Sequence, residues 1–370
     1  MNNEMFDMLG PEKIIEVYNP KVGMHGLVVI DNTALGPGKG GIRMTPSVSE
    51  EEVARLARAM TYKNALAELP FGGAKSGIIA NDRELTKLEK KEIVVAFSKA
   101  LKGIIPREYV AAPDMNMAEE EMEWFSKANG SKKACTGKPK KMGGLPHELG
   151  STGYGVAIAT EVAVKFLGKK LKGMTFAVEG FGNVGTFATK FLTENGAKLV
   201  AVSDSKGCLT DPKGINYEKL LQIKEEKGSV VFYSEKRPLV CPGIISAKAD
   251  ILITAAIPDL IKVSDVNKVN AKIIIEGSNI PMTQEVENLL AQRGVLIVPD
   301  IIANAGGVIS SYVEYTNGTE KKMFNLVKQK ISKNTLLILK EAKKQKVIPR
   351  VAAIDIAKKR ILKKCDICKK

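Results

Sequence analysis

The sequence has little of several features that would define other protein classes. Only 5% of its 370 residues are aromatic, and no uninterrupted apolar run reaches membrane-spanning length. Its first residues, 1–13, are acidic and mixed and lack the charged-then-apolar order of a signal peptide. We therefore expect a cytoplasmic protein with no membrane partner.

Cysteine is also scarce, with five residues scattered along the chain. They are too few and too dispersed for a disulfide framework, so reduced thiols are expected. Cys365 and Cys368 form a lone C-x-x-C near the end, which is half of a four-ligand zinc set. We interpret this pair first as a frayed tail and second as a metal site, and we predict no metal.

The net charge of +15 is concentrated at one end of the chain. Residues 321–370 contain 17 Lys or Arg and 3 acids, and the remainder is nearly neutral. The apolar spacing of this segment predicts two amphipathic helices, broken by Pro349. Phe324 is the one aromatic residue among these lysines, too few for a base-stacking surface, so solvated helix faces are favoured over a nucleic-acid partner.

The length suits two domains, and the two halves have different patterns. In the first half, Ser49 and Glu52 predict a capping box at the start of a helix that ends near Pro70. The other expected elements there are strands at 26–32, 76–81 and 108–114 and a helix near 86–102. A Lys-, Gly- and Pro-rich stretch at 131–146 marks a boundary.

Beyond that boundary strands alternate with helices, which predicts a parallel sheet with helices on both faces. Helices are expected at 152–167 and 184–194, and strands at 175–179, 198–204, 249–255, 272–278 and 294–300.

A dinucleotide-binding motif lies between the first of these strands and the next helix. The three glycines of G-x-G-x-x-G are Gly180, Gly182 and Gly185, and Asp204 ends the following strand. Such glycines let the backbone approach a pyrophosphate at a helix N-terminus, while the acid accepts hydrogen bonds from the adenosine ribose. Asp204 favours NAD, although Ser203, Ser205 and Lys206 could accommodate the 2′-phosphate of NADP.

Lys75 stands in the glycine-rich stretch 68–78, but the stretch is not a phosphate-binding P-loop. Ala74 precedes the lysine and Leu69 takes the place of the outer glycine. We expect Lys75 in a glycine-rich turn, where close packing desolvates the ammonium and lowers its pKa. Lys63, beside the buried stripe of its helix, suits an anion, and Asp114 ends a strand where catalytic groups often project.

Six motifs occur in an order that resembles the glutamate/leucine/phenylalanine/valine dehydrogenase family. They are GPGKGGIRMTPSV (36–48), TYKNALAELPFGGAKSGI (61–78), APDMNM (112–117), STGYGV (151–156), VEGFGNVG (178–185) and VPDIIANAGGVISSYVEY (298–315). The resemblance implies an α/β fold of two domains, with a cleft between an α/β substrate domain and a Rossmann dinucleotide-binding domain. The substrate domain would span 1–140, completed by helices at 331–370, and the Rossmann domain 141–330.

The resemblance also implies roles for particular residues. Lys75 would activate water, Asp114 would shuttle protons, and Lys63 would bind the substrate α-carboxylate. Further substrate contacts would be Lys39, Ala112, Asn304, Val308 and Ser311. Cofactor contacts would be Thr152, Gly180, Gly182, Asn183, Val184, Gly185, Asp204 and Asn279.

Lys39 and Ser311 favour glutamate as the substrate, because a buried lysine needs the γ-carboxylate as its partner. The implied reaction is oxidative deamination of L-glutamate to 2-oxoglutarate and ammonia, or its reverse, with hydride transfer to NAD or NADP. The alternative is a leucine, valine or phenylalanine dehydrogenase. Met117 replaces the family's common threonine. The stretch 144–153 lacks an arginine often seen in glutamate enzymes, and the chain is short for that type.

Two other classes of function stay open from the residues alone. One is a non-catalytic dinucleotide sensor, which the set of Lys63, Lys75 and Asp114 disfavours. The other is a nucleic-acid binder that uses 321–370. The family resemblance further implies a homo-oligomer, with a hexamer expected.

Overall fold

The computed structural model describes residues 5–146, 149–233, 243–365 and 368. The chain forms two compact units. Unit 1 contains Met1–Leu149, Val308–Met323 and Asp355–Lys370, and unit 2 contains Gly150–Gly307 and Phe324–Ile354. The expected division differs from this one, because 331–354 belong to unit 2 and Val308–Met323 belongs to unit 1.

Unit 1 is built on a mixed sheet in the order β1-β2-β4-β3-β5. Its strands are β1 (Lys13–Asn19), β2 (Met24–Asn32), β3 (Gly38–Thr45), β4 (Gly72–Ile79) and β5 (Tyr109–Pro113). β3 runs parallel to both β4 and β5, whereas β2 is antiparallel to β1 and β4. The helices up to the boundary are α1 (Glu50–Leu66), η2 (Asp82–Glu84), α2 (Lys87–Ala100), α3 (Glu119–Asn129) and η3 (Lys140–Met142).

Helix α1 starts where the sequence predicts, because the Ser49 side chain accepts a hydrogen bond from the Glu52 backbone N–H at 3.2 Å. The Glu52 side chain pairs with Arg43 rather than completing a capping box. The helix packs tightly on β4, since a Cβ added at Gly73 would lie 2.3 Å from the Thr61 backbone nitrogen. It ends at Leu66, before the expected limit near Pro70.

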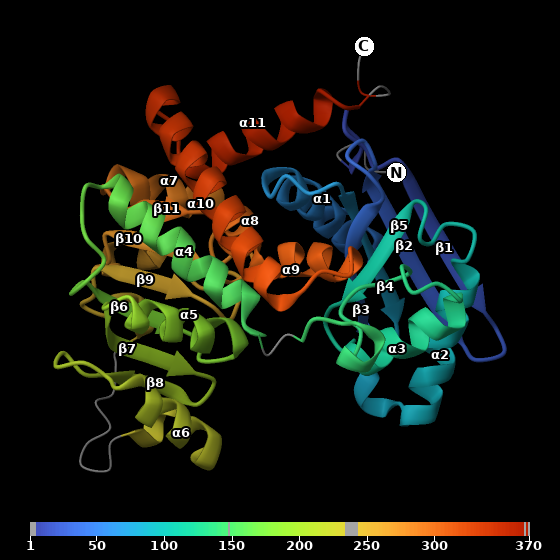
Figure 1. Cartoon of the computed structure of the whole chain (residues 1–370), viewed down its shortest axis with the longest axis horizontal. Helices are drawn as coiled ribbons and strands as arrows, with labels where there is room; N and C mark the ends of the chain where they lie inside the picture. The colour runs from blue at the N-terminus through green and yellow to red at the C-terminus, as the bar shows by residue number, and fades with distance from the viewer. Residues whose placement is uncertain (1–4, 147–148, 234–242, 366–367, 369–370) are drawn as a thin grey trace. The chain divides into compact units, whose positions relative to one another are not determined.

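Unit 2 is built on a six-stranded sheet in the order β11-β10-β9-β6-β7-β8. Its strands are β6 (Thr175–Glu179), β7 (Lys198–Asp204), β8 (Gly207–Thr210), β9 (Ile251–Thr254), β10 (Ile273–Glu276) and β11 (Leu296–Val298). The first helices of the unit are α4 (Ser151–Phe166), α5 (Asn183–Glu194), α6 (Tyr217–Lys227), α7 (Gln284–Gln292) and α8 (Asp300–Ala303). Short 3-10 helices are η5 (Val230–Tyr233), η6 (Ile244–Ser246) and η7 (Val263–Lys268). Figure 1 shows α4 and α5 side by side against this sheet.

The prediction of a parallel sheet is confirmed for the five expected strands, and a sixth strand that was not predicted, β8, pairs antiparallel with β7. The chain closes with α9 (Gly306–Tyr315), α10 (Glu320–Gln345) and α11 (Pro349–Leu362). Pro349 opens α11, a position where its missing N–H costs little. No helix among the described residues is both long and apolar enough to cross a membrane.

The expectation of reduced thiols is wrong for Cys365 and Cys368, which are joined by a disulfide, and for Cys208, which is also disulfide-bonded. Cys135 is a free, buried thiol. Within the described ranges, no group of three or more His, Cys, Asp or Glu side chains is arranged to hold a metal.

Candidate active site

Lys75 and Asp114 form the centre of the candidate site in unit 1. Lys75 lies in the middle of strand β4, so the expected glycine-rich turn is wrong. Asp114 directly follows β5, as the sequence predicts. The Lys75 ammonium lies 2.7 Å from Oδ2 of Asp114. The fold therefore brings together two proton-carrying groups that are 39 residues apart in the sequence.

The surroundings of this pair change the acidity of both groups. Burial lowers the pKa of Lys75, although Asp114 opposes the change. Burial alone would raise the pKa of Asp114, but Lys75 and Arg43 outweigh it and hold the pKa below its usual value. The predicted direction for Lys75 is therefore confirmed, with packing within the sheet as its physical cause.

Two residues that sequence reasoning missed complete this centre. Nε of Arg43 donates to Oδ2 of Asp114 at 3.0 Å, which leaves that oxygen shared between two cations. A Cβ added at Gly41 would lie 2.7 Å from Cβ of Asp114 and 3.3 Å from Nζ of Lys75. The two-residue period of a strand supplies the missed signal, because Lys39, Gly41 and Arg43 share one face of β3.

Lys39 is buried, with 2% of its surface exposed. Nζ donates to the Ala111 carbonyl at 3.0 Å, the one hydrogen bond that the described residues give it. Burial lowers the pKa of Lys39 to about 7, and nearby Glu314 partly offsets this change. An ammonium with one neutral partner is an electrostatically incomplete site, suited to an anion.

Four other predicted substrate residues lie on three elements of unit 1. Lys63 is half-buried in the last turn of α1, and Ala112 is half-buried in β5. Val308 and Ser311 are half-buried on α9. Their roles stay predictions.

The glycine motif of unit 2 has the geometry of an anion-binding turn. Gly180 has a φ of +89°, and a Cβ on Gly185 would lie 1.8 Å from the Gly180 carbonyl oxygen. A Cβ on Gly182 would meet no atom within 4 Å. The next residues, Asn183 and Val184, start α5, whose N-terminus no side chain caps. The residues present therefore fit a dinucleotide pyrophosphate.

Asp204 is already engaged by several donors of unit 2. Oδ1 accepts from the Lys206 N–H at 2.9 Å and the Ser229 hydroxyl at 3.0 Å. Oδ2 accepts from Nζ of Lys224 at 2.7 Å and the Val230 N–H at 2.9 Å. Burial would raise the pKa of Asp204, but Lys224 and these hydrogen bonds lower it. A ribose hydroxyl would have to compete with four donors.

Asn304 has an unsatisfied acceptor on the same unit. Its side-chain nitrogen donates to Oδ1 of Asn279 at 2.9 Å and to the Gly277 carbonyl at 3.2 Å. Its Oδ1 is buried and accepts no hydrogen bond from the described residues. Thr152 lies close in space to Gly307, three residues after Asn304, because a Cβ added at Gly307 would lie 2.9 Å from Oγ1 of Thr152. An amide group of a ligand could donate to the free oxygen.

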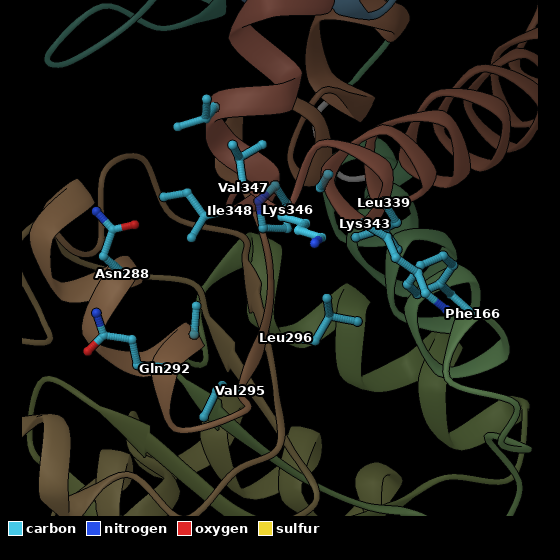
Figure 2. A pocket seen from close by; sticks show the side chains of 14 residues that line it. Phe166, Asn288, Gln292, Val295, Leu296, Leu339, Lys343, Lys346, Val347 and Ile348 are labelled. Atoms are coloured by element: carbon cyan, nitrogen blue, oxygen red, sulfur yellow. The ribbon is translucent and has the colours of Figure 1, made fainter.

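A separate cavity of about 600 Å³ lies elsewhere on unit 2 (Figure 2). Its walls come from the ends of α4, α7 and α10 and are largely apolar. Nζ of Lys343 lies 5.9 Å from the centre of the Phe166 ring at its edge. No predicted site residue lines this cavity, so it is distinct from the dinucleotide motif.

Comparison with known proteins assigns the chain to a family. Residues 143–366 match the model for Glutamate/Leucine/Phenylalanine/Valine dehydrogenase, and 11–130 match the Glu/Leu/Phe/Val dehydrogenase dimerisation domain. A glutamate dehydrogenase of Aeropyrum pernix is 41% identical over 350 residues, 90% of this chain and 84% of that protein. An NADP-specific glutamate dehydrogenase of Saccharolobus shibatae is 39% identical over 322 residues, 83% and 76% of the two chains.

The solved structures agree with the sequence relatives. A hetero-hexameric glutamate dehydrogenase of Thermus thermophilus, in a Leu-bound form, superposes with a TM-score of 0.86 at 26% identity. The match covers 98% of this chain and 92% of that one. The chain belongs to the Glu/Leu/Phe/Val dehydrogenase family, the NAD(P)-dependent amino-acid dehydrogenases. Within that family it is most like glutamate dehydrogenase.

Proposed function

We propose that the protein deaminates L-glutamate oxidatively to 2-oxoglutarate and ammonia, and catalyses the reverse reaction. The observation that carries the choice of substrate is the buried Lys39 ammonium with a single backbone partner. Among the described residues, none places a negative charge in hydrogen-bond contact with the Lys39 ammonium. A substrate γ-carboxylate supplies this counter-charge. Ser311 adds a hydroxyl for the same carboxylate.

Lys75 and Asp114 in unit 1 carry out the proton transfers of the reaction. Lys63 binds the substrate α-carboxylate. Lys75, with its lowered pKa, removes a proton from the water that attacks the iminium carbon. Asp114 carries protons to and from the amino group, and Arg43 keeps it ionised between transfers. Gly41 leaves room for the substrate beside both groups.

A nicotinamide cofactor, when bound, supplies the hydride acceptor for the substrate Cα. Its pyrophosphate would be held by Gly180, Gly182, Gly185 and the start of α5, with Asn304 and Thr152 further along the cofactor. Asp204 supports NAD. The Lys224 ammonium neutralises this carboxylate and reduces its repulsion of a 2′-phosphate, so we propose NAD with NADP also accepted.

The active assembly is a homo-oligomer, and we propose a hexamer. The support is the likeness to the Thermus thermophilus protein, which is a hetero-hexamer. Light scattering of the purified protein tests the subunit number directly.

The experiment for the function is a substrate panel followed by absorbance of reduced nicotinamide. Glutamate, leucine, valine and phenylalanine are each offered with NAD and with NADP. Turnover of glutamate supports the proposal. Turnover of leucine alone would contradict the role of Lys39, and no turnover of any substrate would favour a cofactor sensor.

A further inference from the structure

Glu314, which sequence reasoning did not select, lies buried at the centre of a hydrogen-bond network in unit 1. Oε1 accepts from Nζ of Lys138 at 2.6 Å and from the Lys138 N–H at 3.3 Å. Oε2 accepts from the N–H groups of Gly137 at 3.0 Å and Leu145 at 3.3 Å. Only 4% of Glu314 is exposed, and both carboxylate oxygens are satisfied.

The segment 135–138, which Glu314 holds, is also bonded to the Ala111 carbonyl, the hydrogen-bond acceptor of Lys39. The Ala111 carbonyl accepts from Nζ of Lys39 and also from the Thr136 N–H at 3.0 Å. Nζ of Lys138 donates to the Cys135 carbonyl at 2.7 Å, next to Thr136. Residues 135–138 are therefore fixed between β5 and α9, and the position of the Lys39 acceptor depends on both attachments.

We propose that Glu314 is a positioning residue for Lys39. Its carboxylate fixes 135–138 against β5 and so holds the Ala111 carbonyl that accepts from Lys39, and its negative charge favours the Lys39 ammonium without contacting it. The proposal rests on the proposed function, because it concerns how Lys39 recognises the substrate γ-carboxylate.

The charges around Lys39 determine how the proposal can be tested. Glu314 favours its ammonium form, whereas Lys138 and Lys75 disfavour it. Burial raises the pKa of the Cys135 thiol to about 12, so this neighbour stays neutral near pH 7. Glu314 and Lys138 form an ion pair with each other but act on Lys39 with opposite signs.

The test compares Glu314→Gln with Lys138→Gln by the pH profile of kcat/KM for glutamate. Glu314→Gln should move the alkaline loss of kcat/KM to lower pH. Each pH unit of movement lowers kcat/KM about tenfold at a pH above both midpoints. Lys138→Gln should move the same loss to higher pH. If Glu314 and Lys138 had only a structural role, the alkaline loss of kcat/KM would move in the same direction in both variants. That result would overturn the proposal.

Two controls separate Lys39 from the other titrating groups. Norvaline lacks the γ-carboxylate, so its kcat/KM should show no alkaline loss from deprotonation of Lys39 in either variant. Glu123→Gln removes a carboxylate on α3 that pairs at 2.7 Å with Lys141, three residues after Lys138, and it should leave both profiles unchanged.

Binding of glutarate, a dicarboxylate that does not react, gives a readout without turnover. In the intact enzyme, the alkaline loss of its affinity should move to lower pH in Glu314→Gln and to higher pH in Lys138→Gln. If Glu314→Gln does not fold, the direction of the Lys138→Gln shift decides, and movement to lower pH would overturn the proposal. Absence of glutamate turnover by the unmodified enzyme would instead contradict the proposed function.

Discussion

The ammonium of Lys75 on β4 and the carboxylate of Asp114, directly after β5, lie 2.7 Å apart across the intervening strand β3. Burial destabilises both charges, and the contact between them compensates for part of this cost. Arg43 gives the carboxylate a second cation. This arrangement lowers the pKa of the base while it keeps the acid ionised, which suits a pair that exchanges protons near neutral pH.

Replacement of either partner should remove most of the catalysis. We expect Lys75→Met and Asp114→Asn each to lower kcat by about 10²–10⁴-fold, the usual contribution of a positioned acid or base. Initial rates with glutamate measure the effect, and circular dichroism checks that the variants fold. Retention of more than about a tenth of the activity by either folded variant would contradict its proposed role.

A methyl group at position 41 should also inactivate the enzyme. Gly41→Ala would place Cβ 2.7 Å from Cβ of Asp114 and 3.3 Å from Nζ of Lys75, where the substrate is proposed to lie. Gly103→Ala is the matched control, because its Cβ would meet no atom within 4 Å. We expect kcat/KM for glutamate to fall at least about tenfold in the first variant only. Equal rates would show that the space beside Gly41 is not used.

Sequence patterns predicted the Rossmann unit more completely than the substrate unit. Strands β6 and β7 have the expected bounds, since each is an apolar run next to a clear helix. In unit 1, β3 was not predicted, because its glycine-rich sequence has low strand propensity and its burial comes from neighbouring strands. For the same reason Lys75 was expected in a turn.

Sequence reasoning selected Lys39, Lys75 and Asp114 for the candidate site, but it missed the residues that contact or support them. Lysines and acids next to apolar segments are visible in a sequence, and the family motifs place them. Gly41, Arg43 and Glu314 act through strand register and long-range contacts, such as the 176 residues between Lys138 and Glu314. Such contacts leave no local pattern in a single sequence.

The choice of cofactor should depend on Lys224. Its ammonium lies 2.7 Å from Oδ2 of Asp204 and neutralises the carboxylate that would otherwise repel a 2′-phosphate. Lys224→Gln should therefore raise the ratio of kcat/KM for NAD to that for NADP by roughly tenfold, the effect of about 1.4 kcal/mol. Lys219→Gln, on the same helix, serves as the control. An unchanged ratio would mean that Asp204 does not face the cofactor.

Arg350 should be essential for the stability of unit 2. It pairs with three buried carboxylates, at 2.5 Å from both Glu276 and Glu287 and 2.9 Å from Asp300. Arg350→Met leaves these acids without a cation and should lower the free energy of unfolding by about 3–5 kcal/mol at pH 7. Lys359→Met breaks an exposed pair on the same helix and should cost less than about 0.5 kcal/mol.

The effect of Arg350 on stability should depend on pH in a defined direction. Burial raises the pKa of Glu276 well above its usual value, and Arg350 opposes this rise. Without Arg350 the folded state keeps protons that the unfolded state releases above a pKa of about 4.3, so stability falls as pH rises. Urea unfolding at pH 4.5 and 7.5 measures the difference. A loss that is larger at pH 4.5 would contradict the account.

The most direct test of the account is the substrate preference of Lys39→Leu. Rates with glutamate and with norvaline are measured for this variant and for the unmodified enzyme. If Lys39 reads the γ-carboxylate, kcat/KM for glutamate falls at least about a hundredfold, the effect of an unpaired charge, while that for norvaline stays or rises. An equal loss for both substrates, or an unchanged rate with glutamate, would contradict the central claim that this buried lysine selects glutamate.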